Sequence, residues 1–351
     1  IQTGAGGHVA QGQHHALFHA LQAADVKAGV GVLKQWQQVG SALAQQKLKF
    51  AHVYETSEPY HTAAVWAAGE IGKRTSNRYA VEVFPASSLG KETDINQGLT
   101  LGTVDIIYTG QLFAGRNYGP ISIGGAPFMF RDFDHWKKFS TSKLFDELGE
   151  GYAKAAAGNK VIAITYYGNR QTTSNKAINK PADMKGLKIR VPDAPLYTLF
   201  PRAVGANPTP IAFAYVYVAL QNKTVEAQEN PLPTIDAKKF YEVQSHINIT
   251  AHITDALLTI VGGPLWAKLS DADKKTFTAV FREASARATG EIVEAEKKLM
   301  SEFTKRGKTV VMVDRKPFIA AVEKYYKDGK QPDGSALPWP KDLYAKVQAI
   351  R

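Results

Sequence analysis

Two arginines stand near the ends of apolar strands, where a side chain can face a ligand. Arg190 lies in LKIRV, residues 187–191, whose leucine, isoleucine and valine share one face of a short strand. The opposite face, which carries Arg190, meets either water or an anion. Arg170 follows the apolar run VIAITYY and a glycine turn, so its side chain should project into a cleft. Two guanidiniums in one cleft repel each other unless an anion joins them, and a guanidinium fork suits a carboxylate.

An asparagine and four histidines are the other candidates for chemistry. Asn230, in AQENPLP, ends a further predicted strand, where its amide either donates to a carboxylate or satisfies a turn. The chain has no cysteine, HExxH, GxSxG or phosphate loop, so nothing indicates an enzyme. The histidines are either bases or ordinary structural and surface residues; they are His52, His61, His246 and His252.

The composition is that of a soluble globular protein. The 351 residues are 44% hydrophobic and 21% charged, enough for two domains, and no run of 18 apolar residues allows a membrane span. The net charge of +11 is scattered without dense basic runs, so we expect no nucleic acid partner. This charge either attracts small anions or only maintains solubility. The absence of cysteine fits an oxidising compartment but also a cytosolic protein.

Residues 1–46 differ in composition from the rest of the chain and are rich in Gly, Gln, Ala and His. They end near Ala42-Leu43-Ala44, an export cleavage pattern after a weak apolar run, so they are either an altered leader or a tag or extension. His15 and His19, with His14, are spaced to touch a metal, but no carboxylate or cysteine completes the set. We therefore predict no metal and no cofactor.

From Leu48 onward strands and helices alternate, which predicts a mostly parallel sheet flanked by helices. The pattern occurs twice, and two α/β units predict two lobes with a ligand cleft between them. The predicted strands are 48–54, 79–84, 103–109, 160–167, 187–191 and 224–230, with extended pieces at 246–250 and 256–261.

One helical stretch is unusually long. It runs from Ser270, a suitable N-cap, to Gly307, a suitable stop, and at 1.5 Å per residue it would extend about 50 Å. Such a helix braces both lobes. The alternative is two helices broken near Gly290.

Three segments resemble a known family. YGNRQTTSNKAINKPADMKGLKIRVP, GANPTPIAFAYVYVALQNKTVEAQENP and AKKFYEV are similar to the DctP-type solute-binding proteins of tripartite ATP-independent periplasmic (TRAP) transporters, a resemblance that covers residues 47–330. It implies a periplasmic receptor whose two α/β lobes close over a small organic acid and deliver it to the transporter's membrane subunits. In the family, the arginine of K-I-R-V-P, here Arg190, pairs with the ligand carboxylate. The matching assisting and pocket residues are Arg170, Asn230, Phe213 and Glu55.

The chain departs from the family pattern at two positions. Tyr215 stands where the family usually has glutamate; either it narrows the pocket and removes an acceptor, or the position serves lobe geometry. Sialic acid-binding members have an acidic residue where this chain has Gly110, which leaves Gln111 as the nearest polar candidate. We therefore expect a smaller 2-oxo, 2-hydroxy, dicarboxylic or aromatic acid.

The resemblance also gives an expected organisation. We expect a monomer that closes about a hinge near Gly168 and Ala256. Two other functions remain open: a sensory protein that docks to a chemoreceptor, and an enzyme that acts on an organic acid in the cleft. The expected parts are an extension at 1–46, lobe I at 47–167 plus 256–295, and lobe II at 168–255 plus 296–351.

Overall fold

The computed structural model describes residues 45–351, of which 47–351 form one compact unit. The predicted leader pattern and the histidines at 14, 15 and 19 lie outside the described residues. None of the helices in the described part combines the length and apolar character that crossing a membrane requires.

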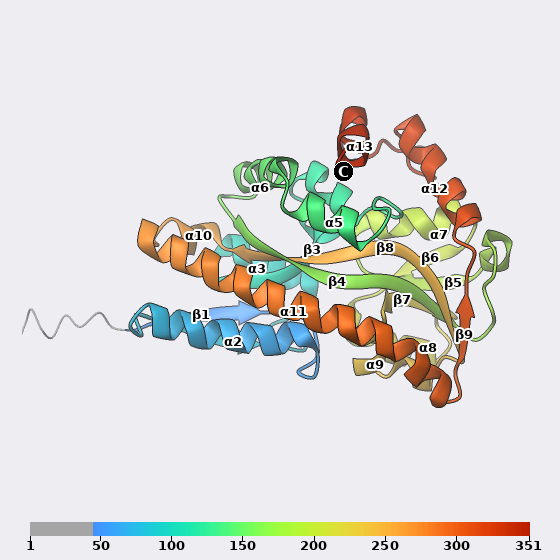
Figure 1. Cartoon of the computed structure of the whole chain (residues 1–351), viewed down its shortest axis with the longest axis horizontal. Helices are drawn as coiled ribbons and strands as arrows, with labels where there is room; N and C mark the ends of the chain where they lie inside the picture. Colours follow the sequence, from blue (N-terminus) through green and yellow to red (C-terminus); the bar gives the residue numbers. More distant parts are fainter. Residues whose placement is uncertain (1–44) are drawn as a thin grey trace, which may run out of the picture. The chain divides into compact units, whose positions relative to one another are not determined.

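A mixed sheet forms the centre of this unit (Figure 1). Its strand order is β2-β1-β3-β8-β4-β7-β5-β6, with β9 also paired to β8. The β1–β3, β5–β7, β5–β6 and β8–β9 pairs are parallel, whereas β3–β8, β4–β8 and β4–β7 are antiparallel. The centre of the sheet is therefore antiparallel, and the prediction of a mostly parallel sheet is wrong there. The strands are β1 (Gln46–Ala51), β2 (Tyr79–Phe84), β3 (Ile106–Gly110), β4 (Lys160–Ser174), β5 (Lys188–Val191), β6 (Asn207–Pro210), β7 (Ala227–Pro231), β8 (His246–Val261) and β9 (Thr309–Met312).

The two longest strands, β4 and β8, pair with each other through the middle of the sheet (Figure 1). The extended pieces predicted at 246–250 and 256–261 are therefore parts of one strand. The register of the pair shifts between Tyr166 and Gly168, and Gly168 has φ 115°, a conformation that favours glycine. These strands connect the two halves of the sheet, so an irregularity here suits the expected hinge.

The predicted long helix is continuous. α11 (Asp271–Lys305) has 35 residues, begins where the Ser270 hydroxyl accepts a hydrogen bond from the Asp273 amide, and is followed by Gly307 with φ 75°. Gly290 lies inside it, so the two-helix alternative is wrong. α11 packs against α2 (Pro59–Arg74) and β4, and also against α9 (Leu232–Ala237) and β9 (Figure 1). It therefore contacts elements of both expected lobes.

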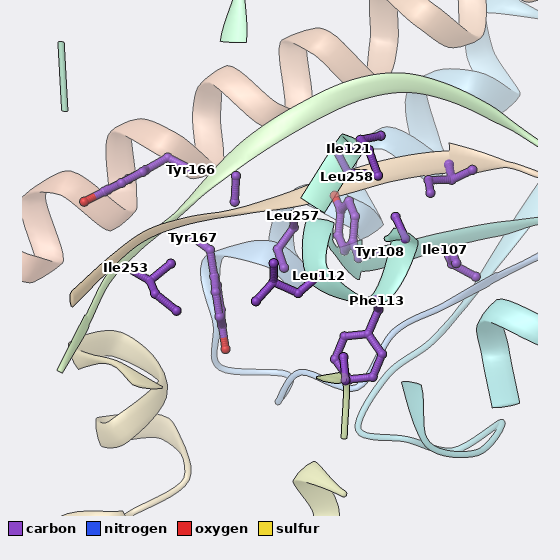
Figure 2. Close-up of a cluster of buried hydrophobic side chains, with 14 of the residues drawn as sticks. Ile107, Tyr108, Leu112, Phe113, Ile121, Tyr166, Tyr167, Ile253, Leu257 and Leu258 are labelled. Carbon is purple, nitrogen blue, oxygen red and sulfur yellow. The ribbon is translucent and has the colours of Figure 1, made fainter. Parts of the chain in front are cut away.

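The remaining helices cover the sheet and form two hydrophobic clusters. The larger cluster includes Tyr108, Leu112 and Leu258 (Figure 2), and the smaller one lies around α8, α9 and the end of α11. The C-terminal α13 contacts α5, since the Val347 carbonyl lies 3.0 Å from His135 Nε2. These helices are α3 (Glu92–Leu101), α4 (Gln111–Ala114), α5 (Phe133–Ser140), α6 (Lys143–Ala155), α7 (Leu199–Ala203), α8 (Val216–Gln221), α10 (Gly263–Trp266), α12 (Lys316–Asp328) and α13 (Lys341–Gln348).

Two glycine substitutions test the special geometry at the β4 bulge. A Cβ at Gly168 would lie 2.8 Å from Pro231 Cβ in a strained backbone, so Gly168→Ala should lower the free energy of unfolding by about 1–3 kcal/mol. A Cβ at Gly290 meets nothing within 4 Å, so Gly290→Ala should raise it by about 0.5–1 kcal/mol. Urea unfolding measures both, and equal effects would contradict strain at the bulge.

Candidate functional site

A cavity, open at its mouth, lies where strands from both halves of the sheet end. One wall comes from the loop after β1, the start of α3 and the end of β3; the other comes from the residues after β5 and from β7. The central strands contribute Tyr167, Arg170, Asp255 and Leu257 between the walls. The carboxyl ends of parallel strands thus meet across the cavity, as in other α/β proteins.

Arg190 lines this cavity as a buried cation without a carboxylate partner. Its side chain is only 1% exposed, and Nε donates to the Ile211 carbonyl at 2.8 Å. Within residues 45–351, Nη1 has no hydrogen-bond partner and no carboxylate forms an ion pair with the guanidinium. Burial lowers the pKa of Arg190 to about 10, with the charge of Glu229 opposing and that of Arg170 adding to this effect. Arg190 therefore has capacity for an incoming anion.

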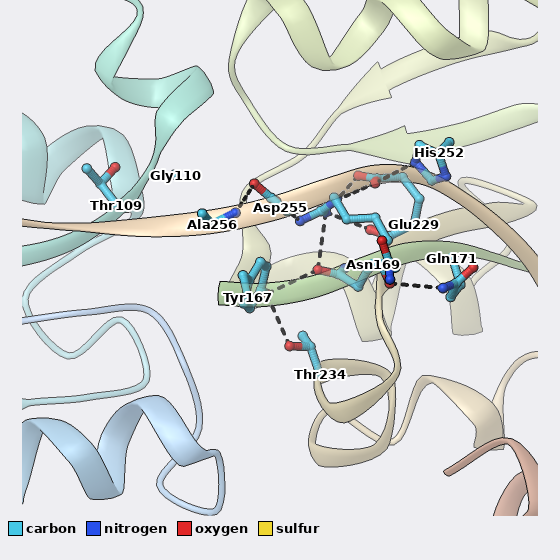
Figure 3. A network of polar contacts seen from close by, with 12 residues as sticks. Thr109, Gly110, Tyr167, Asn169, Gln171, Glu229, Thr234, His252, Asp255 and Ala256 are labelled. Atoms are coloured by element: carbon cyan, nitrogen blue, oxygen red, sulfur yellow. Dashed lines mark hydrogen bonds and ion pairs between the residues drawn. The ribbon is translucent and has the colours of Figure 1, made fainter. Parts of the chain in front are cut away.

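Arg170 also lines the cavity, but it is already neutralised. Its Nη2 donates to Glu229 Oε1 at 2.8 Å and its Nη1 to Asp255 Oδ2 at 2.9 Å. Figure 3 shows these carboxylates in one network with His252, whose Nε2 lies 3.0 Å from Glu229 Oε2. The expectation that both guanidiniums lack a counterion is thus wrong for Arg170, which carries two carboxylates of its own.

Burial and the charge of Arg170 determine the pKa values of Glu229 and Asp255 in this network. Burial alone would raise the pKa of Glu229, but the Arg170 charge and the hydrogen bonds from His252 and Arg170 outweigh it and lower that pKa to about 2. Burial also raises the pKa of Asp255, and there it outweighs the attraction of Arg170. Glu229 is therefore the principal counterion of Arg170.

Asn230 and aromatic rings complete the walls. The Asn230 Oδ1 atom accepts a hydrogen bond from Arg170 Nη2 at 3.2 Å, which fixes its amide orientation because a guanidinium only donates. Phe213 packs against Tyr54 with ring centroids 6.2 Å apart, across the mouth of the cavity. The Arg170 guanidinium lies 5.2 Å from the centre of the Tyr197 ring. Aliphatic parts of a ligand would therefore meet aromatic surface.

Glu92, which the sequence analysis missed, places an acceptor in the cavity. It is the first residue of α3, and its Oε1 accepts hydrogen bonds from the Gly110 amide at 2.8 Å and the Thr109 hydroxyl at 2.9 Å. The other oxygen, Oε2, accepts no hydrogen bond from the part of the chain that the structure describes. Burial raises the pKa of Glu92 to about 7, against the effect of those two donors. Glu92 therefore lies beside Gly110 on the cavity wall.

Comparison with known proteins agrees with this architecture. The family model of bacterial extracellular solute-binding proteins, family 7, matches residues 50–331. The chain belongs to this family. It is 34% identical to a solute-binding protein of Roseobacter denitrificans over 81% of this chain and 87% of that protein, and 32% identical to the sialic acid-binding periplasmic protein of Vibrio cholerae over 82% and 89%. A TRAP periplasmic solute-binding protein from Polaromonas, solved with D-erythronate, superposes with a TM-score of 0.81 at 31% identity, covering 87% of this chain and 99% of that one.

The structure brings together four of the residues predicted from the family pattern. Arg190, Arg170, Asn230 and Phe213 all line the cavity, although their contact with a ligand stays a prediction. Neither a histidine nor a serine is among the lining residues.

Three other predicted residues lie away from the cavity lining. Tyr215 is 66% exposed, so its replacement of the family glutamate does not narrow the cavity. Glu55 forms an ion pair with Lys238 at 2.6 Å. The Gln111 amide is buried against Gly124, where neither its oxygen nor its nitrogen has a partner among the described residues. We therefore no longer expect these three side chains to touch the ligand.

The two arginines should respond differently to truncation. Arg170→Ala leaves Glu229 and Asp255 buried without a cation, so it should lower the free energy of unfolding by about 3–5 kcal/mol. Arg190→Ala removes an unpaired buried charge and should have a much smaller effect. Urea unfolding without ligand measures both, and equal losses would mean that Arg190 has a counterion.

Proposed function

We propose that this protein is a periplasmic receptor that captures a small hydroxy acid in the cavity and delivers it to the membrane subunits of a TRAP transporter. The unpaired Arg190 guanidinium is the observation that carries this proposal. A ligand carboxylate would accept hydrogen bonds from its Nη atoms and supply the missing counterion. Arg170 would act indirectly, by holding Asn230 against the same cavity.

Capture requires the cavity walls to move apart, because Arg190 is 1% exposed in the present conformation. The proposed lobes, 47–167 plus 256–295 and 168–255 plus 296–351, meet on β4 and β8 near the bulge at Gly168. A rotation at this bulge would open the cavity to a ligand. Closure around the anion would then remove its carboxylate from water.

The polarity of the cavity supports a hydroxy acid. Arg190 gives a donor for a carboxylate, and the free Oε2 of Glu92 gives an acceptor for a hydroxyl group. The Polaromonas relative binds D-erythronate, a hydroxy acid that has both groups. Sialate is larger, and the acidic residue of its binders is replaced by Gly110 here, so we propose a smaller acid.

The family membership favours transport over the two alternatives. The family consists of transport solute-binding proteins rather than enzymes. A sensory protein would use the same cavity, and the presence of neighbouring genes for transporter membrane subunits would separate transport from sensing. Mass spectrometry of candidate acids after incubation with the protein would detect any turnover.

A thermal-shift screen of carboxylic acids followed by calorimetry tests the role of Arg190. Loss of one partner of a buried charge pair costs about 2–5 kcal/mol, so Arg190→Ala should weaken binding roughly 30-fold to several thousand-fold. Arg190→Lys should recover part of the affinity, because it keeps the charge but not the two-pronged geometry. Tyr215→Glu, at an exposed position, is the matched control and should bind as the wild type does. Unchanged affinity in Arg190→Ala would exclude Arg190 from the site.

The acceptor role of Glu92 predicts a preference for hydroxylated acids. D-Erythronate should bind more tightly than butanoate, which has the same carbon chain without hydroxyl groups. A hydrogen bond to a charged group contributes about 1.5–3 kcal/mol, so Glu92→Ala should reduce this preference by roughly 10- to 150-fold. Competition calorimetry measures the affinity for both acids. An undiminished preference in the variant would show that other groups bind the hydroxyl groups.

A further inference from the structure

Glu58 lies outside the cavity lining and is a buried carboxylate without a cationic partner among the described residues. It is 1% exposed, in the loop between β1 and α2. The Glu55 amide donates to its Oε1 at 2.9 Å, and its Oε2 lies 2.7 Å from the Thr234 hydroxyl of α9. The nearest ammonium, on Lys238, pairs with Glu55 instead. Nothing in the described residues therefore neutralises an ionised Glu58 directly.

A line of polar contacts joins Glu58 to the cavity. The Thr234 hydroxyl lies 3.1 Å from the Tyr167 hydroxyl, which lies 3.4 Å from Asn230 Oδ1 (Figure 3). Asn230 Oδ1 faces Arg170, so it must be an acceptor, and Tyr167 must donate to it. The hydrogen in the contact between Thr234 and Tyr167 must then come from Thr234.

A count of hydrogens along this line leaves one missing. Three contacts connect Glu58, Thr234, Tyr167 and Asn230, and each needs one hydrogen. The two hydroxyl groups supply two of them. A proton on Glu58 Oε2 supplies the third, because Glu58 can then donate to Thr234. Every contact in the line is satisfied only when Glu58 is protonated.

We propose that Glu58 binds a proton when the cavity closes and that, as a positioning residue, it holds Asn230 in place through Thr234 and Tyr167. The proposal rests on the proposed function, because closure is the step that traps the ligand. Glu58 and Thr234 lie in opposite proposed lobes, so opening would separate them and expose Glu58 to water. The proton would come from solvent and return to it on opening.

The surroundings of Glu58 are consistent with a neutral acid. The charged or titratable groups that face it are Glu55 from its own loop, Lys238 directly after α9, Tyr60 from α2 and Tyr167 from β4. Lys238 is held by Glu55, and burial raises the pKa of both tyrosines, so they stay neutral. Burial likewise raises the pKa of Glu58 to about 7, against the opposing effect of its contacts with the Thr234 hydroxyl and the Glu55 amide.

The direction of the pH effect follows. The pKa of Glu58 is raised in the closed state and returns toward its ordinary value of about 4.3 in the open state. Closure therefore takes up a proton between these two values and is favoured at low pH. The affinity for ligand should fall by up to about tenfold per pH unit from pH 5 to 7 through this group, and should level off above that range.

Calorimetry with D-erythronate in two buffers of different ionisation enthalpy gives the number of protons taken up on binding. At pH 6 we expect Glu58→Gln, which mimics the protonated acid, to take up about one proton fewer than the wild type. Its affinity should also fall less between pH 5 and 7. Glu92→Gln is measured in parallel, because the pKa of Glu92 is also raised to about 7 and its uptake must be separated from that of Glu58.

The outcomes distinguish this inference from the proposed function. If D-erythronate binds and Glu58→Gln takes up as many protons as the wild type, the coupling is wrong while the receptor function stands. If neither D-erythronate nor any other acid in the screen binds the wild type, the proposed function fails first. Infrared difference spectra of the wild type provide a second measurement: ligand addition should produce a protonated carboxylic acid band, and its absence would overturn the proposal whether or not Glu58→Gln folds.

Discussion

A guanidinium removed from water without a counterion loses solvation free energy that a hydrogen bond to one carbonyl does not restore, and Arg190 is in this state. Its pKa, lowered to about 10 by burial, expresses the same cost. The closed cavity therefore lacks the one negative charge that would neutralise Arg190. A carboxylate that enters compensates this charge and is itself enclosed, so an anion and the closed conformation stabilise each other. In the proposed receptor the aromatic walls and the acceptor at Glu92 would select among anions, but they would not replace this interaction.

The register of the sheet determines which of the two arginines has counterions. Arg170 lies on β4 between β7 and β8, and these neighbours carry Glu229 opposite Thr172 and Asp255 opposite Gly168. Both carboxylates are within reach of Arg170. On β5 the residues paired with Arg190 are Gln228 and Thr209, which carry no charge. The same residue type thus stabilises the fold at one position and stays open to a ligand at the other.

Local sequence patterns predicted several helices and strands, but they did not predict which strands pair. The period of two identified the face of Arg190, and the cap and stop residues identified both ends of α11. The antiparallel centre of the sheet was missed because strand partners lie far apart in the sequence. Glu92 was missed for a related reason: an acidic residue at the start of a helix is ordinary, and only the end of β3 brings it to the cavity. The choice between the two roles of Tyr215 stayed open in the sequence because a family pattern does not show which way a side chain points, and the structure places it at an exposed position.

Closure buries charges of opposite sign in two places. Arg190 enters the cavity as a cation, and Glu58 enters the contact between the loop after β1 and α9 as a carboxylate. The two groups do not form an ion pair with each other, so each must be compensated separately. In the proposed receptor a ligand carboxylate would compensate Arg190 and a proton would compensate Glu58, and the line through Thr234 and Tyr167 ends at Asn230 on the cavity wall. A closed state without uncompensated charge therefore requires both an anion and a proton, which makes the stability of the closed receptor depend on ligand and pH together.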